Sequence, residues 1–157
     1  MFMRYFTRDW ATGERPPGRL NEAWEQYSRR LREIQERLPA DVLRIAETWF
    51  LHDGLLRRLI VRPADQSVRM IIDTYERGPF APVHLHYRKV ERFEYYGPDD
   101  VTPWHGPGLG HLLYWEVDLV EGLFEHRLLF ASAVELLIQF REFRLVEPRR
   151  RDCPLPA

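Results

Sequence analysis

The chain has 157 residues, of which 45% are hydrophobic and 30% are charged, and its formal net charge at pH 7 is −1. This composition is typical of one soluble globular domain that buries its own core, and it excludes a disordered chain. A net charge near zero argues against nucleic-acid binding along the whole chain, and no run approaches the ~20 apolar residues of a membrane span. The single cysteine, Cys153, excludes an internal disulfide framework. With no secretion signal evident, we expect a cytoplasmic protein.

The first third of the sequence predicts helices. Thr7 is a suitable N-cap for one short turn, with Phe6 packing as a staple against Trp10 or Ala11. Asn21 and Asp41 would each begin a longer helix. The first of these would run to about residue 38 and the second over 42–51, and the first has one apolar stripe at helical spacing: Trp24, Tyr27, Leu31, Ile34 and Leu38.

The remaining two thirds predict strands. Alternation of period two indicates strands over 55–61, 67–75 and 83–89. The last of these ends where Val90 and Phe93 break the phase, which indicates a bulge or a bend. The stretch His111–Phe143 alternates through three further strands, with Trp115, Phe130 and Ile138 on the buried side. Links this short favour an antiparallel meander.

These elements predict an α+β fold. Two N-terminal helices would pack on one face of a curved, mainly antiparallel sheet of about six strands, arranged as a meander that curls toward a half-barrel. Residues 1–146 would form this single domain, and residues 147–157, rich in proline and charge, would be a disordered tail.

The loop Gly97–Gly110 is the first candidate for function. Its prolines and glycines exclude regular structure, and long loops of this kind are often functional. Trp104 and His105 would either fold back onto the domain or anchor a partner. Asp99 and Asp100 beside them would face a basic partner, or simply water.

A His-x-His pair is the second candidate. His84 and His86 would lie on one face of a strand, a spacing that can hold a metal ion. Glu116, or Asp118 on the same polar face, would complete a two-histidine, one-carboxylate site if their strand lay beside them. The simpler interpretation is two histidines on a solvated face.

Other pairs have structural explanations. His52-Asp53 precedes Gly54 at a helix-to-strand junction, so a turn explains it better than a catalytic pair without a nucleophile. His126 shares its face with Phe124 and would be a core histidine bonded to backbone. No phosphate-binding glycine motif or cofactor motif is present.

The order of features resembles an uncharacterised bacterial family, a domain of unknown function. The resemblance spans about Arg4 to Phe143 and is carried by the start Tyr5-Phe6-Thr7 with Trp10, by Leu51-His52-Asp53-Gly54, and by the final strand. It implies no activity. Small domains of this build also resemble immunity proteins of toxin systems.

The sequence therefore predicts a non-enzymatic cytoplasmic module that binds a protein partner and neither nucleic acid nor membrane. An immunity-like role would be one instance. The alternative is a small-ligand or metal-binding protein that uses the His-x-His strand.

Overall fold

The computed structural model describes residues 1–13, 20–48, 50–74, 81–98 and 109–147. The helices are α1 (Arg8–Ala11), α2 (Leu20–Ile34) and α3 (Ala40–Glu47), and short 3-10 turns follow α2 (Gln35–Arg37) and β1 (Pro63–Asp65). Six strands follow: β1 (Leu55–Arg62), β2 (Ser67–Thr74), β3 (Ala81–Tyr96), β4 (Leu112–Val120), β5 (Leu123–Phe130) and β6 (Glu135–Val146). The α+β prediction is confirmed.

The strands form one antiparallel sheet in the order β1-β2-β3-β6-β5-β4. The C-terminal meander β4-β5-β6 is confirmed, but a continuous six-strand meander is wrong. After β3 the chain passes to the far edge of the sheet, so that β3 pairs with β6 and not with β4. The sheet is open, yet its two edges meet at one end through a bridge between Leu55 and His111.

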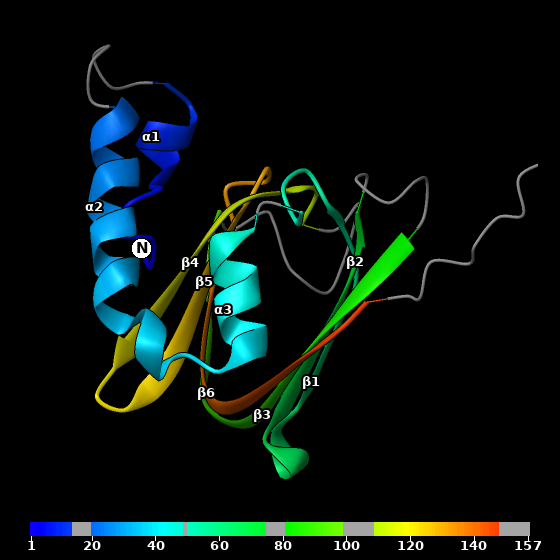
Figure 1. Ribbon diagram of the computed structural model, residues 1–157. Helices are drawn as coiled ribbons and strands as arrows, with labels where there is room; N and C mark the ends of the chain where they lie inside the picture. The colour runs from blue at the N-terminus through cyan, green and yellow to red at the C-terminus, as the bar shows by residue number, and fades with distance from the viewer. Residues whose placement is uncertain (14–19, 49, 75–80, 99–108, 148–157) are drawn as a thin grey trace, which may run out of the picture.

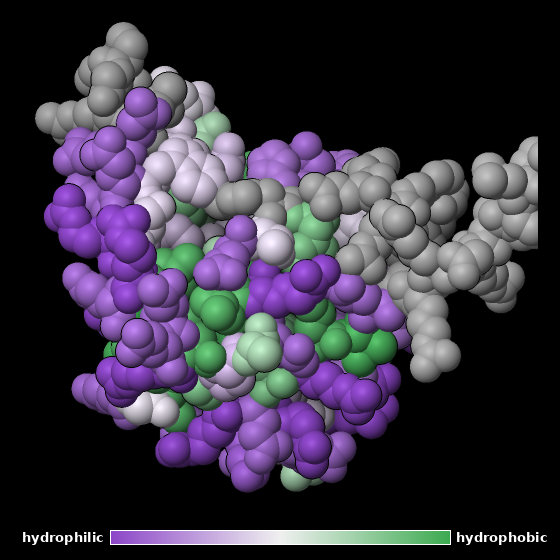
Figure 2. Space-filling view, in the orientation of Figure 1, coloured by the Kyte–Doolittle hydropathy of each residue, from purple (hydrophilic) through white to green (hydrophobic). Residues whose placement is uncertain are grey.

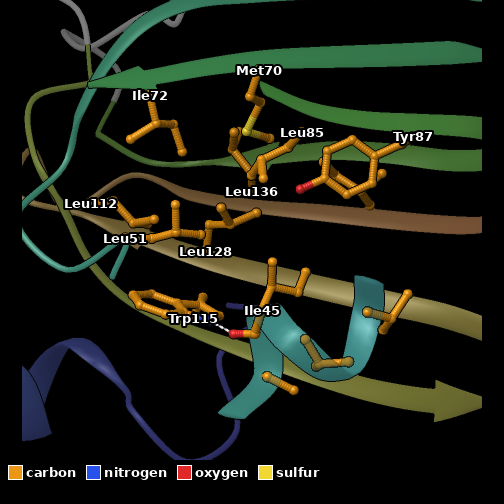
Figure 3. Packing of buried hydrophobic residues seen from close by; sticks show 14 of the residues in the cluster. Ile45, Leu51, Met70, Ile72, Leu85, Tyr87, Leu112, Trp115, Leu128 and Leu136 are labelled. Carbon is orange, nitrogen blue, oxygen red and sulfur yellow. Dashed lines mark hydrogen bonds between the residues drawn. The ribbon is translucent and has the colours of Figure 1, made fainter. Parts of the chain in front are cut away.

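The main core fills the face of the sheet on which α3 lies (Figure 1). Figure 3 shows Trp115 of β4 beside α3, where its indole N–H donates to the carbonyl of Ile45 at 2.6 Å. Trp115, Phe130 and Ile138 are all buried, as the period-two pattern predicts. Figure 2 shows hydrophilic side chains along α2 and hydrophobic ones in the region between α2 and α3.

A second, smaller cluster lies where α1 and α2 stand beside β4 (Figure 1). Tyr27 of α2 places its hydroxyl 2.9 Å from the backbone N–H of Val117, on the outer edge of β4. Around Phe6, aromatic rings pack at centroid distances of 4.6–5.7 Å, from Trp10, Trp24, Tyr27 and Tyr114. The sheet therefore has a helical cover at the β4 edge as well as on its main face.

Several local predictions are confirmed and others corrected. Thr7 does cap α1, accepting from Trp10 N–H at 3.4 Å. Asn21 lies inside α2, which begins at Leu20, and so is not its cap. Asp41 lies inside α3 after Pro39, and its carboxylate instead accepts from the backbone N–H of a residue in β6 at 3.0 Å.

The bulge predicted near Val90 is present, as a shift in the β3–β6 register between Val90 and Arg92. The strand continues through it to Tyr96, so β3 is longer than predicted. Gly54 is required at the junction before β1, because a Cβ there would lie 2.6 Å from the Ile72 side chain. In the part of the chain that the structure describes, no helix is long and apolar enough to cross a membrane.

Candidate functional site

A cluster of charged side chains is buried on the face of β4 and β5 opposite the main core. Arg127 of β5 is 1% exposed and contacts three carboxylates: Glu116 at 2.9 Å, Asp118 at 3.1 Å and Glu125 at 2.5 Å. Burial opposes ionisation of the guanidinium, but Glu125 and Glu116 outweigh it and raise the pKa of Arg127. The cluster is therefore a set of ion pairs that satisfy one another.

The N-terminal segment covers this cluster with its backbone. Glu116 accepts the N–H groups of Arg4, Tyr5 and Phe6 at 2.6–3.1 Å. Glu135 of β6 accepts in the same way from the two residues before them. These carboxylates fasten the start of the chain to the sheet, so the structure assigns Glu116 a structural role.

Asp118 is held at the edge of the same cluster. Its carboxylate accepts from the Arg30 side chain of α2 at 2.8 Å and from the backbone N–H of Leu119 at 2.8 Å. Burial alone would raise the pKa of Asp118, but the backbone N–H and the guanidinium groups of Arg30 and Arg127 hold it below its ordinary value. Asp118 is therefore ionised in the folded protein at neutral pH.

His126 is a core histidine, as predicted, but its partner is not the backbone. Its Nδ1 lies 2.7 Å from the Tyr87 hydroxyl, and both side chains are fully buried. Burial, assisted by the positive charge of Arg127, lowers the pKa of His126 to about 3. Burial also raises the pKa of Tyr87. The pair is neutral and lies inside the main core.

The opposite face of β1, β2, β3 and the end of β6 is different in character. Because Val68, Met70 and Ile72 point into the main core, the residues between them point outward. Strand register then places side chains in rows across four strands: Ile60, Arg69, His86 and Arg144 in one, and Arg58, Ile71, His84 and Val146 in the next. We call these eight residues the basic face.

The arginines of the basic face are short of anionic partners. Among the described residues, no ion pair involves Arg58, Arg69 or Arg144, all of which are exposed. The nearby carboxylates already have partners: Asp73 pairs with the Arg57 side chain at 2.6 Å, and Glu142 with Lys89 at 2.5 Å. Within the described part of the chain, the face therefore carries positive charge that no carboxylate compensates.

His86 lies at the centre of the first row. Burial lowers its pKa, and the charges of Arg69, His84 and Arg144 lower it further. Its Nε2 is buried with no hydrogen-bond partner among the residues that the structure describes. A neutral imidazole between two arginines is suited to an anion more than to a cation.

The predicted metal site does not assemble as proposed. His84 and His86 do share a face, with ring centroids 6.0 Å apart. Glu116, however, lies in β4, and β6 and β5 separate that strand from β3. Its carboxylate is occupied by Arg127 and backbone N–H groups. Within the described ranges, no group of three metal-binding side chains exists.

The four residues of the predicted partner-binding loop, Asp99, Asp100, Trp104 and His105, lie outside the described residues. So does the predicted tail except for Glu147, which pairs with Arg44 at 2.8 Å. The sequence reasoning missed the two arginines that flank His86. Their positions in the rows follow only from strand register, and β6 is distant from β2 in the sequence.

Comparisons with known proteins add little. No protein-family model matches the chain, and no curated protein matches it. Among solved structures, an uncharacterized protein from Neisseria gonorrhoeae is similar, with 9% identity and a TM-score of 0.47. The match covers 60% of this chain and 90% of that one. So distant a likeness carries no argument about function.

Proposed function

We propose that this protein is a non-enzymatic binding module whose partner is a protein with an acidic surface. The observation that carries the proposal is the row Arg69–His86–Arg144, with Arg58 in the neighbouring row, on one sheet face where no described carboxylate pairs with these arginines. An immunity-like protein that neutralises a toxin would be one member of this class.

The chemistry of the face fits a protein partner. Guanidinium groups bind carboxylates through paired N–H donors, and arginine is enriched at protein interfaces. Ile60, Ile71 and Val146 lie between the charges, so a partner would also cover apolar surface. Uncompensated charge increases the rate at which an oppositely charged surface associates.

The other charge-rich surface does not offer the same property. Along α2, exposed arginines such as Arg29 and Arg32 alternate with exposed glutamates such as Glu22 and Glu25. A surface of mixed sign attracts neither an acidic nor a basic partner strongly. Arginines on α2 and on the 3-10 turn that follows it therefore provide a matched control for those on the basic face.

The experiment uses affinity capture from cells that make the protein, with bound proteins identified by mass spectrometry. The test variant is Arg58→Glu/Arg69→Glu/Arg144→Glu, and the control is Arg29→Glu/Arg32→Glu/Arg37→Glu. We expect an acidic protein that the wild type and the control retain and the test variant loses. Purified, it should bind with an affinity that falls as salt rises.

Two results would overturn the proposal. One is a partner retained equally by the test variant and the control, since the basic face would then be dispensable. The other is that the wild type and the control bind RNA, tested with a single-stranded polyuridylate probe, that the test variant does not bind, while no acidic protein is captured. In both proteins the circular dichroism spectrum checks that folding is intact.

A further inference from the structure

The basic face contains a pocket at the point where β2 begins. Its volume is about 260 Å³, and its lining includes Ser67, Arg69, His86 and Arg88, with Asp65 from the turn after β1. We infer that this pocket binds a phosphate monoester, carried as a phosphorylated side chain on the acidic partner. The inference rests on the proposed function and names the group that the partner would present.

The first argument is the Nε2 of His86, which has no hydrogen-bond partner among the described residues. Leaving a buried polar nitrogen without a hydrogen bond costs roughly 1–3 kcal/mol in proteins generally, so such groups usually mark a site that something else completes. An oxygen of a bound phosphate could accept a hydrogen bond from protonated Nε2. His86 itself lines the pocket, and because its Nε2 is buried, the imidazole ring would turn toward the ligand to make this bond.

The number and kind of donors is the second argument. Four residues that line the pocket have side chains able to donate hydrogen bonds: Ser67, Arg69, His86 and Arg88. A phosphate monoester has three acceptor oxygens and carries about −1.5 to −2 charges at pH 7. Arginine pairs with phosphate through two parallel N–H donors, and clusters of arginine are a recurring way to recognise phosphorylated segments.

The charges that oppose a dianion are few. Asp65 is at the rim of the pocket, and Glu142 lies 3.8 Å from the Arg88 guanidinium while it pairs more closely with Lys89. On the other side, Arg144 of β6 is opposite His86 in the strand register, and His84 is two residues away on the same face. The balance of the surroundings is positive, which disfavours a cation and favours an anion.

The test measures binding of a short acidic peptide to the full chain by calorimetry, in three forms that differ at one position: serine, phosphoserine or glutamate. We expect the phosphoserine form to bind about 10-fold tighter than the glutamate form, as extra charge-assisted hydrogen bonds imply. Arg69→Gln and His86→Gln should each remove about 10-fold in affinity for that form. Arg32→Gln, an exposed arginine on α2 outside the basic face, should change it by less than about 2-fold.

The outcomes separate this inference from the proposed function. If the glutamate and phosphoserine forms bind equally, while Arg69→Gln and His86→Gln still lose affinity and Arg32→Gln does not, the pocket has no preference for phosphate and only the acidic-partner proposal stands. If inorganic phosphate binds as tightly as the phosphopeptide, the site takes a free anion and the inference is wrong. If capture identifies an acidic partner but no peptide binds, the inference also fails.

Discussion

Arg69 and Arg127 occupy equivalent positions in the two halves of the sheet, and their surroundings differ completely. Both point away from the main core, Arg69 from β2 and Arg127 from β5. Over β5 the N-terminal segment adds a second cover, and three carboxylates surround Arg127. Over β2 nothing described covers Arg69, which is exposed.

The difference shows what decides whether a charge is structural or available. Strand alternation determines the face on which a side chain lies, but only the cover on that face determines its role. Where the face is covered, charges must be compensated within the protein, because desolvating an unpaired ion is costly. Where it is open, water compensates the charge until a partner replaces the water.

The largest predicted effect is a loss of stability in the covered half of the sheet, β4, β5 and β6, where the N-terminal segment lies over the charged cluster. Replacing Arg127 with methionine would leave Glu116, Asp118 and Glu125 together in a buried site without their shared cation. We expect a loss of about 3–5 kcal/mol in the free energy of unfolding, measured by denaturant titration. The matched control is Arg141→Met, because Arg141 pairs with Glu91 on the exposed surface and should contribute at most about 1 kcal/mol.

Equal losses in the two variants would contradict the comparison, since the burial of Arg127 would then have no energetic consequence. A further measurement makes the result specific to the cover. Amide hydrogen exchange at Arg4, Tyr5 and Phe6 should accelerate in Arg127→Met, because Glu116 would reorient once its cation is gone.

The next effect is the pH dependence of stability that His126 causes in the main core. The pKa of His126 is about 3 in the folded protein, against 6.5 as its ordinary value. Between these two pH values, His126 binds a proton in the unfolded chain but not in the folded protein. Its contribution to the free energy of unfolding is therefore fully present above about pH 6.5 and is lost as the pH falls toward 3. This residue should contribute about 1.4 kcal/mol of loss per pH unit inside that window.

His126→Gln isolates this contribution, because an amide can still bond to the Tyr87 hydroxyl but does not titrate. The free energy of unfolding of the wild type should fall more steeply than that of the variant from pH 6 to pH 4. Parallel curves would mean that His126 is charged inside the core. The contribution of His86 is the same in both proteins and cancels.

The sequence predicts the covered half well in one respect and poorly in another. Period-two alternation identifies β4, β5 and β6 and the burial of Trp115, because one face of each strand is apolar. The same alternation presents Glu116 and Asp118 as a solvated face. It cannot reveal that the first residues of the chain return to cover them, since that contact spans more than a hundred residues.

One sequence signal does point to the cover. The first ten residues include Met3, Phe6 and Trp10, more apolar surface than a segment outside the core would have, and all three are buried. The order of the strands has no comparable signal. The loop after β3 is long enough to lead to either side of the sheet, so the pairing of β3 with β6, and with it the basic face, follows only from tertiary packing.

A smaller effect tests the edge of the covered half. The Tyr27 hydroxyl accepts from the backbone N–H of Val117, on the side of β4 that pairs with no other described strand. Tyr27→Phe would leave that buried N–H without an acceptor, at a cost of about 1–3 kcal/mol in the free energy of unfolding. The exchange rate of the Val117 amide should rise with it. An unchanged rate would show that the helical cover does not protect this edge.

The smallest effect concerns the open half, where the comparison predicts almost none. Arg69→Gln removes a charge that no described carboxylate pairs with, and it relieves the repulsion that lowers the pKa of His86. The free energy of unfolding should therefore change by less than about 0.5 kcal/mol, while the pKa of His86, followed by proton NMR of its imidazole, should rise. The combination is informative because it reverses the pattern expected for Arg127→Met: a local electrostatic change without loss of the fold. A loss of several kcal/mol in the free energy of unfolding would mean that Arg69 is a structural residue, and the basic face would then not be free to bind a partner.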